Sequence, residues 1–195
     1  MTAKAVVFIS GAGSNLQAIL DADLPMQVVL VVSNNPEAKG LQRAERAGVP
    51  TWVLDHRLFA KREDYDQALL DKIFPLQPDW VILAGFMRRL TPVFVDAFAG
   101  KLVNIHPSLL PKYPGLHTYQ RALDAGDQEV GSTVHLVTQE VDAGPILAQQ
   151  TVPVEAGDTV ESLKQKVQAL EHELYPRVIG ELLTSPEKFQ KNPAR

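Results

Sequence analysis

Short apolar runs alternate with amphipathic segments along the first hundred residues. The runs are rich in Val, Ile and Leu, which is typical of strands buried on both faces, and they cover residues 4–10, 26–33, 51–54, 79–85 and 102–106. The segments between them carry apolar residues at helical spacing and predict helices over residues 14–22, 38–48, 61–74 and 92–98. This alternation predicts an α/β, Rossmann-like fold, in which helices cover both faces of a mostly parallel twisted sheet.

The pattern changes after residue 130. Two long β-type runs at residues 131–138 and 146–154 are joined by a turn-rich segment that does not fit a helix, which predicts a late antiparallel strand pair. A short helix is expected to start at His117, and a last helix covers residues 159–183 with a bend at Pro176. Residues 184–195 are polar and are expected to be loose. Because no repeat or linker interrupts the pattern, we expect one domain over residues 1–195.

Composition narrows the class of protein. The chain has 195 residues, of which 45% are hydrophobic and 22% charged, as in ordinary globular domains. It has no cysteine, which excludes disulfides, thiolate metal sites and a cysteine nucleophile. The net charge of −4 argues against a nucleic-acid surface, and no apolar run approaches the roughly 20 residues that span a bilayer. We therefore expect a cytoplasmic protein whose partners are small molecules, with no nucleic acid and no membrane.

A glycine-rich loop follows the first strand. Ser10-Gly-Ala-Gly-Ser-Asn15 leads directly into a helix, whose unpaired N–H groups form an anion site suited to phosphate. The loop has no P-loop lysine, and Leu16 stands where a dinucleotide fingerprint has glycine, so a phosphomonoester fits better than a triphosphate or a dinucleotide. The alternative is a plain strand-to-helix turn with Ser14 as the helix N-cap.

An asparagine and a histidine share one face of the strand at residues 102–106. Asn104 and His106 are two positions apart, so both point to the same side, at the strand end where open α/β sheets bind ligands. This pair suits acyl transfer, because the amide can hold a carbonyl oxygen while the imidazole moves a proton or stabilises an oxyanion. The chain has no obvious serine nucleophile elbow, which favours direct attack by an amine or water. The alternative is that both side chains only satisfy local backbone groups.

Other polar residues are interpreted from their positions. Asp142 near His106 would orient that ring and stabilise its protonated form, but on its own it is most simply a turn residue. Glu171 borders the apolar stripe of the last helix and needs a partner, either a ribose hydroxyl or a buried arginine, and the residues alone favour the arginine. His135 is weighed as a strand residue facing the site, and His172 is expected to be structural. No convergent acidic cluster accompanies the histidines, so we expect no metal site.

Several motifs together resemble the phosphoribosylglycinamide formyltransferase family, one of the folate-dependent formyltransferases. Asn104-Ile-His-Pro-Ser-Leu-Leu-Pro111 is similar to the signature of the wider superfamily, whereas the Gly-Ser-Asn loop with the Tyr-Pro-Gly-Leu-His run at residues 113–117 resembles this member specifically. The resemblance covers about residues 4–182 in the family's order. It also includes Leu83-Ala-Gly-Phe-Met-Arg88, Val141-Asp-Ala-Gly-Pro145 and Glu171-His172.

The resemblance implies an activity and a set of site residues. The family transfers the formyl group of 10-formyltetrahydrofolate, a co-substrate, to the amine of phosphoribosylglycinamide in purine biosynthesis. The implied catalytic residues are Asn104, His106 and Asp142, and the implied ribonucleotide-binding residues are Gly13, Ser14, Asn15 and Glu171. The implied folate-binding residues are Arg62, Met87, Arg88, Arg89, Leu90, Asn104, Thr138, Gln139, Glu140 and Val141. Residues 1–100 would form the nucleotide-binding half, and residues 101–183 the catalytic and folate-binding half.

Some questions stay open at this point. Position 89 is usually aliphatic in the family, and the arginine found here leaves the role of its side chain unassigned. The chain is expected to act as a monomer or a homodimer. Alternative activities are hydrolysis of formyltetrahydrofolate, in which water replaces the amine, and binding of a phosphoribosyl ligand by a sensor without catalysis. Methionyl-tRNA formyltransferases carry an extra RNA-binding domain, for which this chain has no room.

Overall fold

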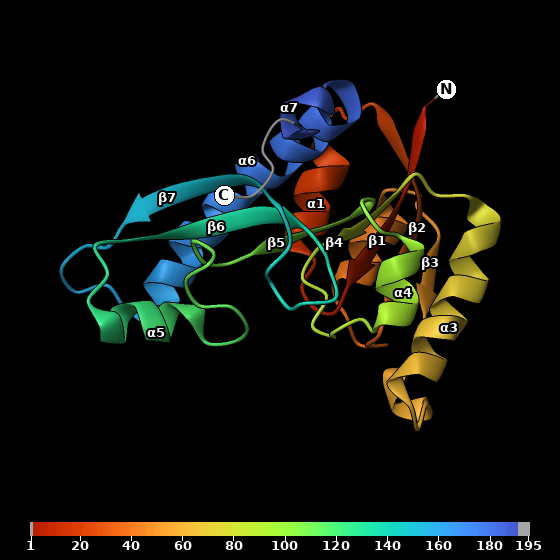
Figure 1. The fold of residues 1–195 in the computed structure, drawn as a ribbon, viewed down its shortest axis with the longest axis horizontal. Coiled ribbons are helices and arrows are strands. Elements are labelled where there is room, and N and C mark those ends of the chain that lie inside the picture. The colour runs from red at the N-terminus through yellow and green to blue at the C-terminus, as the bar shows by residue number, and fades with distance from the viewer. Residues whose placement is uncertain (1, 191–195) are drawn as a thin grey trace.

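The computed structural model describes residues 2–190, which form a seven-stranded sheet with helices on both faces (Figure 1). The strands are β1 (Ala3–Ile9), β2 (Met26–Ser33), β3 (Thr51–Val53), β4 (Trp80–Leu83), β5 (Leu102–His106), β6 (Glu129–Leu136) and β7 (Ile146–Pro153). They lie in the order β3-β2-β1-β4-β5-β6-β7. The fold class predicted from the sequence is confirmed, including the late antiparallel pair.

The five parallel strands create a switch point beside β1. This strand pairs with β2 on one side and with β4 on the other. Strands β2 and β3 therefore lie on one side of β1, and the chain then crosses to the other side, where β4 and β5 lie. The loops after β1 and β4 diverge at this point, which leaves a crevice at the carboxyl ends of the strands where ligands bind in sheets of this kind.

Helices cover both faces because side chains alternate along each buried strand. The helices are α1 (Ser14–Asp21), α2 (Gly40–Arg46), α3 (Arg62–Ile73), α4 (Pro92–Ala97), α5 (Thr118–Ala125), α6 (Val160–Thr184) and α7 (Glu187–Gln190), with short 3-10 turns η1 (His56–Leu58) and η2 (Phe74–Leu76). In β1, Val7 and Ile9 belong to the apolar cluster that contains α1, α2 and α6. Val6 and Phe8 belong to the cluster formed with α3 and α4. Each parallel strand is thus buried on both sides, as its continuous apolar run predicted.

The sheet changes direction at β6. This strand runs antiparallel to both β5 and β7. Asn104 lies opposite His135, and His106 lies opposite Thr133, so these four side chains share one face of the sheet. Figure 1 shows β6 and β7 extending away from the parallel strands, with α5 beside them. Helix α5 begins directly after His117, as predicted, and a separate apolar cluster joins it to β6 and α6.

The C-terminal segment differs from its prediction. Helix α6 begins at a capping box in which Thr159 Oγ1 accepts a hydrogen bond from Ser162 N at 3.2 Å. It continues through Pro176 to Thr184, and the bend expected at Pro176 stays a prediction. The expectation that the polar tail is loose is wrong for α7, because Phe189 packs against the apolar cluster that includes α6. Residues 191–195 of that tail lie outside the described residues.

Tyr175 ties α6 to the two strands that border the crevice. Its ring is fully buried, and its hydroxyl donates to Leu83 O at 2.8 Å and lies 3.2 Å from Val103 O. Burial raises the pKa of this phenol well above its ordinary value, so the hydroxyl keeps its proton.

We expect Tyr175→Phe to lower the free energy of unfolding by about 1–2 kcal/mol, because the ring stays packed while the buried carbonyls lose their donor. Urea unfolding followed by circular dichroism measures this. Tyr119→Phe is the control, because no hydrogen bond from the Tyr119 hydroxyl is found within residues 2–190, and its effect should stay within about 0.5 kcal/mol. Equal losses in the two variants would contradict the role assigned to the Tyr175 hydroxyl.

Candidate active site

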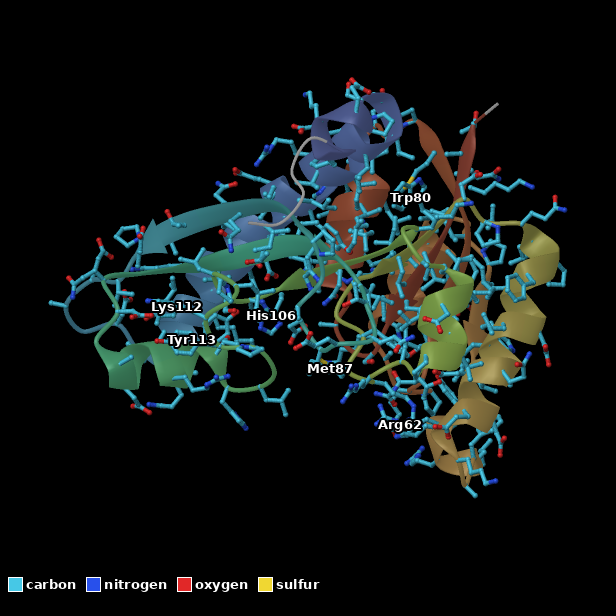
Figure 2. All side chains as sticks on the ribbon, in the orientation of Figure 1. Arg62, Trp80, Met87, His106, Lys112 and Tyr113 are labelled. Atoms are coloured by element: carbon cyan, nitrogen blue, oxygen red, sulfur yellow. The ribbon has the colours of Figure 1, made fainter. Side chains whose placement is uncertain are left out.

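A cavity of about 910 Å³ opens at the carboxyl ends of β1, β4 and β5. It is lined by the loops after these strands, by the turn between β6 and β7 and by one side of α6. All of the catalytic and binding residues that the resemblance implies line it except Arg62. Figure 2 shows His106 near the middle, with Tyr113 on the α5 side and Met87 on the α4 side.

The glycine-rich loop presents a bare helix N-terminus to this cavity. Gly13 is the N-cap of α1, with φ at 72°, and no side chain caps the helix. Ser14 is the first helical residue, so the alternative in which Ser14 serves as the N-cap is wrong. A Cβ on Gly13 would lie 2.6 Å from Gly40 Cα, so both the backbone conformation and the close approach of α2 require glycine here. The first N–H groups of α1 are left for a ligand.

Glu171 reaches the same end of the cavity from α6. Its Oε2 accepts from Asn15 Nδ2 at 3.0 Å, and its Oε1 lies 2.7 Å from Ser132 Oγ. The buried arginine that the residues alone favoured is wrong, because the partners found are an amide and a hydroxyl. Burial raises the pKa of Glu171, and the two hydrogen bonds only partly oppose this.

The hydrogen bonds of Ser132 also indicate that Glu171 carries a proton. Its oxygen also lies 2.7 Å from the carbonyl oxygen of His106, which can only accept. One hydroxyl proton serves one acceptor fully, so a carboxylic acid proton on Glu171 would satisfy the second contact. A neutral Glu171 therefore fits both the burial and the hydrogen-bond pattern.

The three residues implied to be catalytic come together. His106 Nε2 donates to the Tyr113 carbonyl at 2.9 Å, and its Nδ1 lies 3.5 Å from Asp142 Oδ2. The same carboxylate oxygen accepts from Gly115 N at 2.8 Å. Asp142 has φ at 51°, a left-handed conformation that is uncommon for aspartate and is often found at functional sites. Both ring nitrogens of His106 thus face acceptor oxygens, an arrangement that accommodates a doubly protonated ring.

His135 lies beside this group and fixes the amide of Asn104. Its Nδ1 donates to Leu136 O at 3.0 Å, so Nε2 of the neutral ring is left as an acceptor, 3.4 Å from Asn104 Nδ2. Burial lowers the pKa of His135, which favours that neutral form. His135 therefore faces the site. His172 does not line the cavity.

The segment from Met87 to Leu90 forms the opposite wall. Met87 N donates to Ser10 Oγ at 2.8 Å, which ties this wall to the end of β1. Arg89 Nη2 donates to Gln139 O at 3.2 Å and so connects the wall to the turn that carries Asp142. Arg62 lies behind the wall and donates to the carbonyl of Arg89. It is placed to support this segment rather than to line the cavity.

Several residues that build the site were given no role in the sequence analysis, including two from the motif at residues 113–117. Tyr113 and Gly115 act through backbone atoms, which leave no side-chain signal, although both have positive φ values of 55° and 79°. Asp66 is fully buried behind the wall, where its Oδ2 accepts from Thr91 N at 2.5 Å and burial raises the pKa of its carboxyl. A charged residue on the buried side of a helix was the one available signal. Ser132 carried none, because a serine within a strand is common.

Two other kinds of site are not found among residues 2–190. No group of three or more His, Asp or Glu side chains there is placed to hold a metal ion. No helix in that part of the chain has the length and apolar character needed to cross a membrane.

Comparison with known proteins places this fold and site in a family. The sequence profile described as formyl transferase matches residues 3–179, so the chain belongs to the formyl transferase family. The phosphoribosylglycinamide formyltransferase of Escherichia coli (strain K12) is 50% identical over 193 residues, covering 97% of this chain and 91% of that protein. The trifunctional purine biosynthetic protein adenosine-3 of Homo sapiens is 44% identical, covering 91% of this chain and 18% of that protein.

Solved structures agree with the sequence relatives. Glycinamide ribonucleotide transformylase 1 from Symbiobacterium toebii superimposes with a TM-score of 0.91 at 43% identity, covering 94% of this chain and 88% of that one. Phosphoribosylglycinamide formyltransferase from Coxiella burnetii gives 0.90 at 44% identity, with the same coverage of both chains. These relatives place the chain among the phosphoribosylglycinamide formyltransferases, as its motifs predicted.

Glu171 makes the stability of the protein depend on pH. The pKa of its buried carboxyl is raised above the ordinary value of 4.5, so the folded state holds a proton that the unfolded state has released. The free energy of unfolding contributed by this group therefore falls as the pH rises through the unfolded value. Glu171→Gln keeps the shape without a charge and lacks this contribution.

Between pH 4 and pH 8, we expect the wild type to lose stability relative to Glu171→Gln, because only the wild type has the titrating carboxyl. Thermal unfolding at several pH values measures it. Glu173→Gln, an exposed glutamate on the same helix, is the control and should show no such trend. A difference that does not change with pH would contradict the burial of a titrating carboxyl at position 171.

Proposed function

We propose that this chain transfers a formyl group from 10-formyltetrahydrofolate to the amine of phosphoribosylglycinamide in purine biosynthesis. The observation that carries the proposal is the position of His106. It contacts Asp142, lies on the same sheet face as Asn104, and lines one cavity together with the glycine-rich loop and the Met87–Leu90 wall. Two anchoring regions on either side of an amide and an imidazole suit a reaction between two bound substrates.

The ribonucleotide is assigned to the end formed by the glycine-rich loop. The free N–H groups at the start of α1 and the left-handed Gly13 suit its phosphate. Asn15 and Glu171 lie beyond the loop and offer an amide and a carboxyl for ribose hydroxyls and for the glycinamide group. Lys164 also lines this cavity and adds positive charge that suits a phosphate.

The folate is assigned to the other end. Met87 and Val141 are 71% and 40% exposed although both are apolar, and both line the cavity, so a flat ring bound there would cover them. Residues 88–90 and 138–141 line the same end, and we assign their backbone groups to the polar edge of a pterin. We assign Arg62 a supporting role here, because its contact is to the carbonyl of Arg89.

The chemistry follows from these positions. The amine nitrogen forms a bond to the formyl carbon, and the bond between that carbon and the folate nitrogen breaks. The formyl oxygen gains negative charge as the amine adds, and an N–H of Asn104 with the protonated ring of His106 stabilises it. One proton leaves the attacking nitrogen and one reaches the folate nitrogen, carried by His106 or by water. Holding both substrates makes the step effectively unimolecular, which is worth up to roughly 7–11 kcal/mol in ideal cases.

The proposed division of the chain follows the same lines. Residues 1–100 supply the phosphate loop and the wall of the folate end, and residues 101–183 supply the catalytic groups, the folate turn and Glu171. We propose that both halves act as one domain, because a single sheet runs through them. The proposed partners are the two small-molecule substrates.

A formyl-transfer assay with and without the ribonucleotide tests the proposed function. We expect the folate product to form only when phosphoribosylglycinamide is present. Release of formate without the ribonucleotide would instead identify a hydrolase. Binding of the ribonucleotide with no turnover of the folate would identify a ligand sensor.

For His106→Ala we expect a fall in the transfer rate of about two to four orders of magnitude, the usual scale for a general acid–base group. Ribonucleotide binding, measured by calorimetry, should change little because the phosphate loop is untouched. His56→Ala is the control, because that histidine contacts Asn34 and does not line the cavity. Turnover close to the wild type in His106→Ala would remove this residue from the mechanism.

For Asp142→Asn we expect a strong loss of activity at neutral pH. The substitution keeps the volume but removes the charge that faces His106 Nδ1 at 3.5 Å and presents an amide to Gly115 N. Steady-state kinetics measure the loss, which should fall mainly on kcat. Unchanged kcat would show that Asp142 only shapes the turn.

A further inference from the structure

The loop over residues 111–117 brings a backbone acceptor to His106. The carbonyl of Tyr113 is that acceptor, and Gly115 N donates to the catalytic carboxylate two residues later. Tyr113 and His117 both have positive φ values, 55° and 58°, which side chains rarely adopt. Such conformations persist where surrounding contacts determine them. The position of the Tyr113 carbonyl therefore depends on the contacts that hold the Tyr113 side chain.

The Tyr113 side chain is held away from the cavity. Its hydroxyl donates to Asp127 Oδ2 at 2.9 Å, and the guanidinium of Arg121 lies 5.0 Å from the centre of its ring. Arg121 Nη1 also donates to the carbonyl of Pro114 at 2.7 Å, next to Tyr113 in the loop. Lys112 Nζ donates to Asp127 Oδ1 at 3.0 Å (Figure 2 labels Lys112 and Tyr113). Asp127 and Arg121 thus hold the Tyr113 side chain, and Lys112 shares the carboxylate of Asp127.

Asp127 is held in place by the end of α5. It directly follows Gly126, the left-handed C-cap of α5, and its N–H donates to Ala122 O at 3.1 Å. Hydrogen bonds from Lys112 and Tyr113 lower the pKa of this carboxyl, so it stays ionised at neutral pH. The end of α5 therefore presents a charged acceptor in one position.

We propose that Asp127 and Tyr113 are positioning residues for His106: the bond between phenol and carboxylate holds the Tyr113 carbonyl where it accepts from His106 Nε2. Neither residue lines the cavity, so their effect on the reaction passes through the orientation and the protonated nitrogen of that ring. The expected effect on formyl transfer rests on the proposed function, whereas the positioning of His106 does not. The contact with His106 exists without substrate.

The chain offers matched variants for the test. Asp127→Asn and Tyr113→Phe each weaken the bond between the phenol and the carboxylate. Asp124→Asn is the control, because Asp124 is exposed on α5 and accepts from Gln120 at 2.7 Å, with no contact to Tyr113 in the described residues. Tyr113→Phe also keeps the ring under Arg121.

Kinetics give the first readout. We expect kcat of formyl transfer to fall about tenfold in Asp127→Asn and Tyr113→Phe, the scale of a small displacement of a catalytic group, with KM for both substrates within about twofold. The double variant should lose no more than the stronger single variant, because both break one contact. Wild-type kcat in both single variants, or the same loss in Asp124→Asn, would overturn the proposal.

The second readout does not need activity. Nitrogen NMR of the free enzyme, labelled on histidine and assigned with His106→Ala, reports the Nε2–H of His106. We expect this signal to shift or broaden in Asp127→Asn and Tyr113→Phe and to stay unchanged in Asp124→Asn. An unchanged signal in the first two variants would overturn the positioning role, whether or not the proposed reaction is found. Thermal unfolding checks that all variants are folded.

Discussion

The site depends on one imidazole held between two acceptors that come from different parts of the chain. His106 donates from Nε2 to the carbonyl of Tyr113, and its Nδ1 faces the carboxylate of Asp142. The first acceptor belongs to the loop after β5, and the second belongs to the turn between β6 and β7. Gly115 N joins the two by donating to Asp142. The orientation of the ring is thus a tertiary property, set where these segments meet.

The topology of the sheet explains why these segments meet. Strands β1, β4 and β5 end at one edge, where the switch point opens the crevice. Because β6 returns antiparallel to β5, it places His135 directly opposite Asn104, and the turn that follows it reaches back to the same edge. Helix α6 then brings Glu171 to that edge from the other face of the sheet. A purely parallel sheet would leave β6 and its turn out of reach of His106.

The fold was predictable because each parallel strand is buried on both faces and reads as a continuous apolar run. Asn104 and His106 were predictable as a pair because side chains alternate along a strand. The contact of Asp142 with His106 could not be derived from spacing, since 36 positions separate them, and only the family resemblance suggested it. The partner of Glu171 was mispredicted because a serine and an asparagine distant in sequence supply it. Helix α7 was missed because the single apolar Phe189 gives no periodic pattern.

Hydrogen bonds connect the Met87–Leu90 wall to the turn between β6 and β7 and to α4. Arg89 connects the Met87–Leu90 wall to the carbonyl of Gln139, and the amide of Gln139 donates to Asp96 on α4 at 2.7 Å. The arginine at position 89, whose role the motifs leave unassigned, therefore acts as a brace across the opening. A ligand that displaces the Met87–Leu90 wall would therefore also displace α4 and the turn that carries Asp142. Bulky ligands at this end would misalign the carboxylate even when the space itself accommodates them.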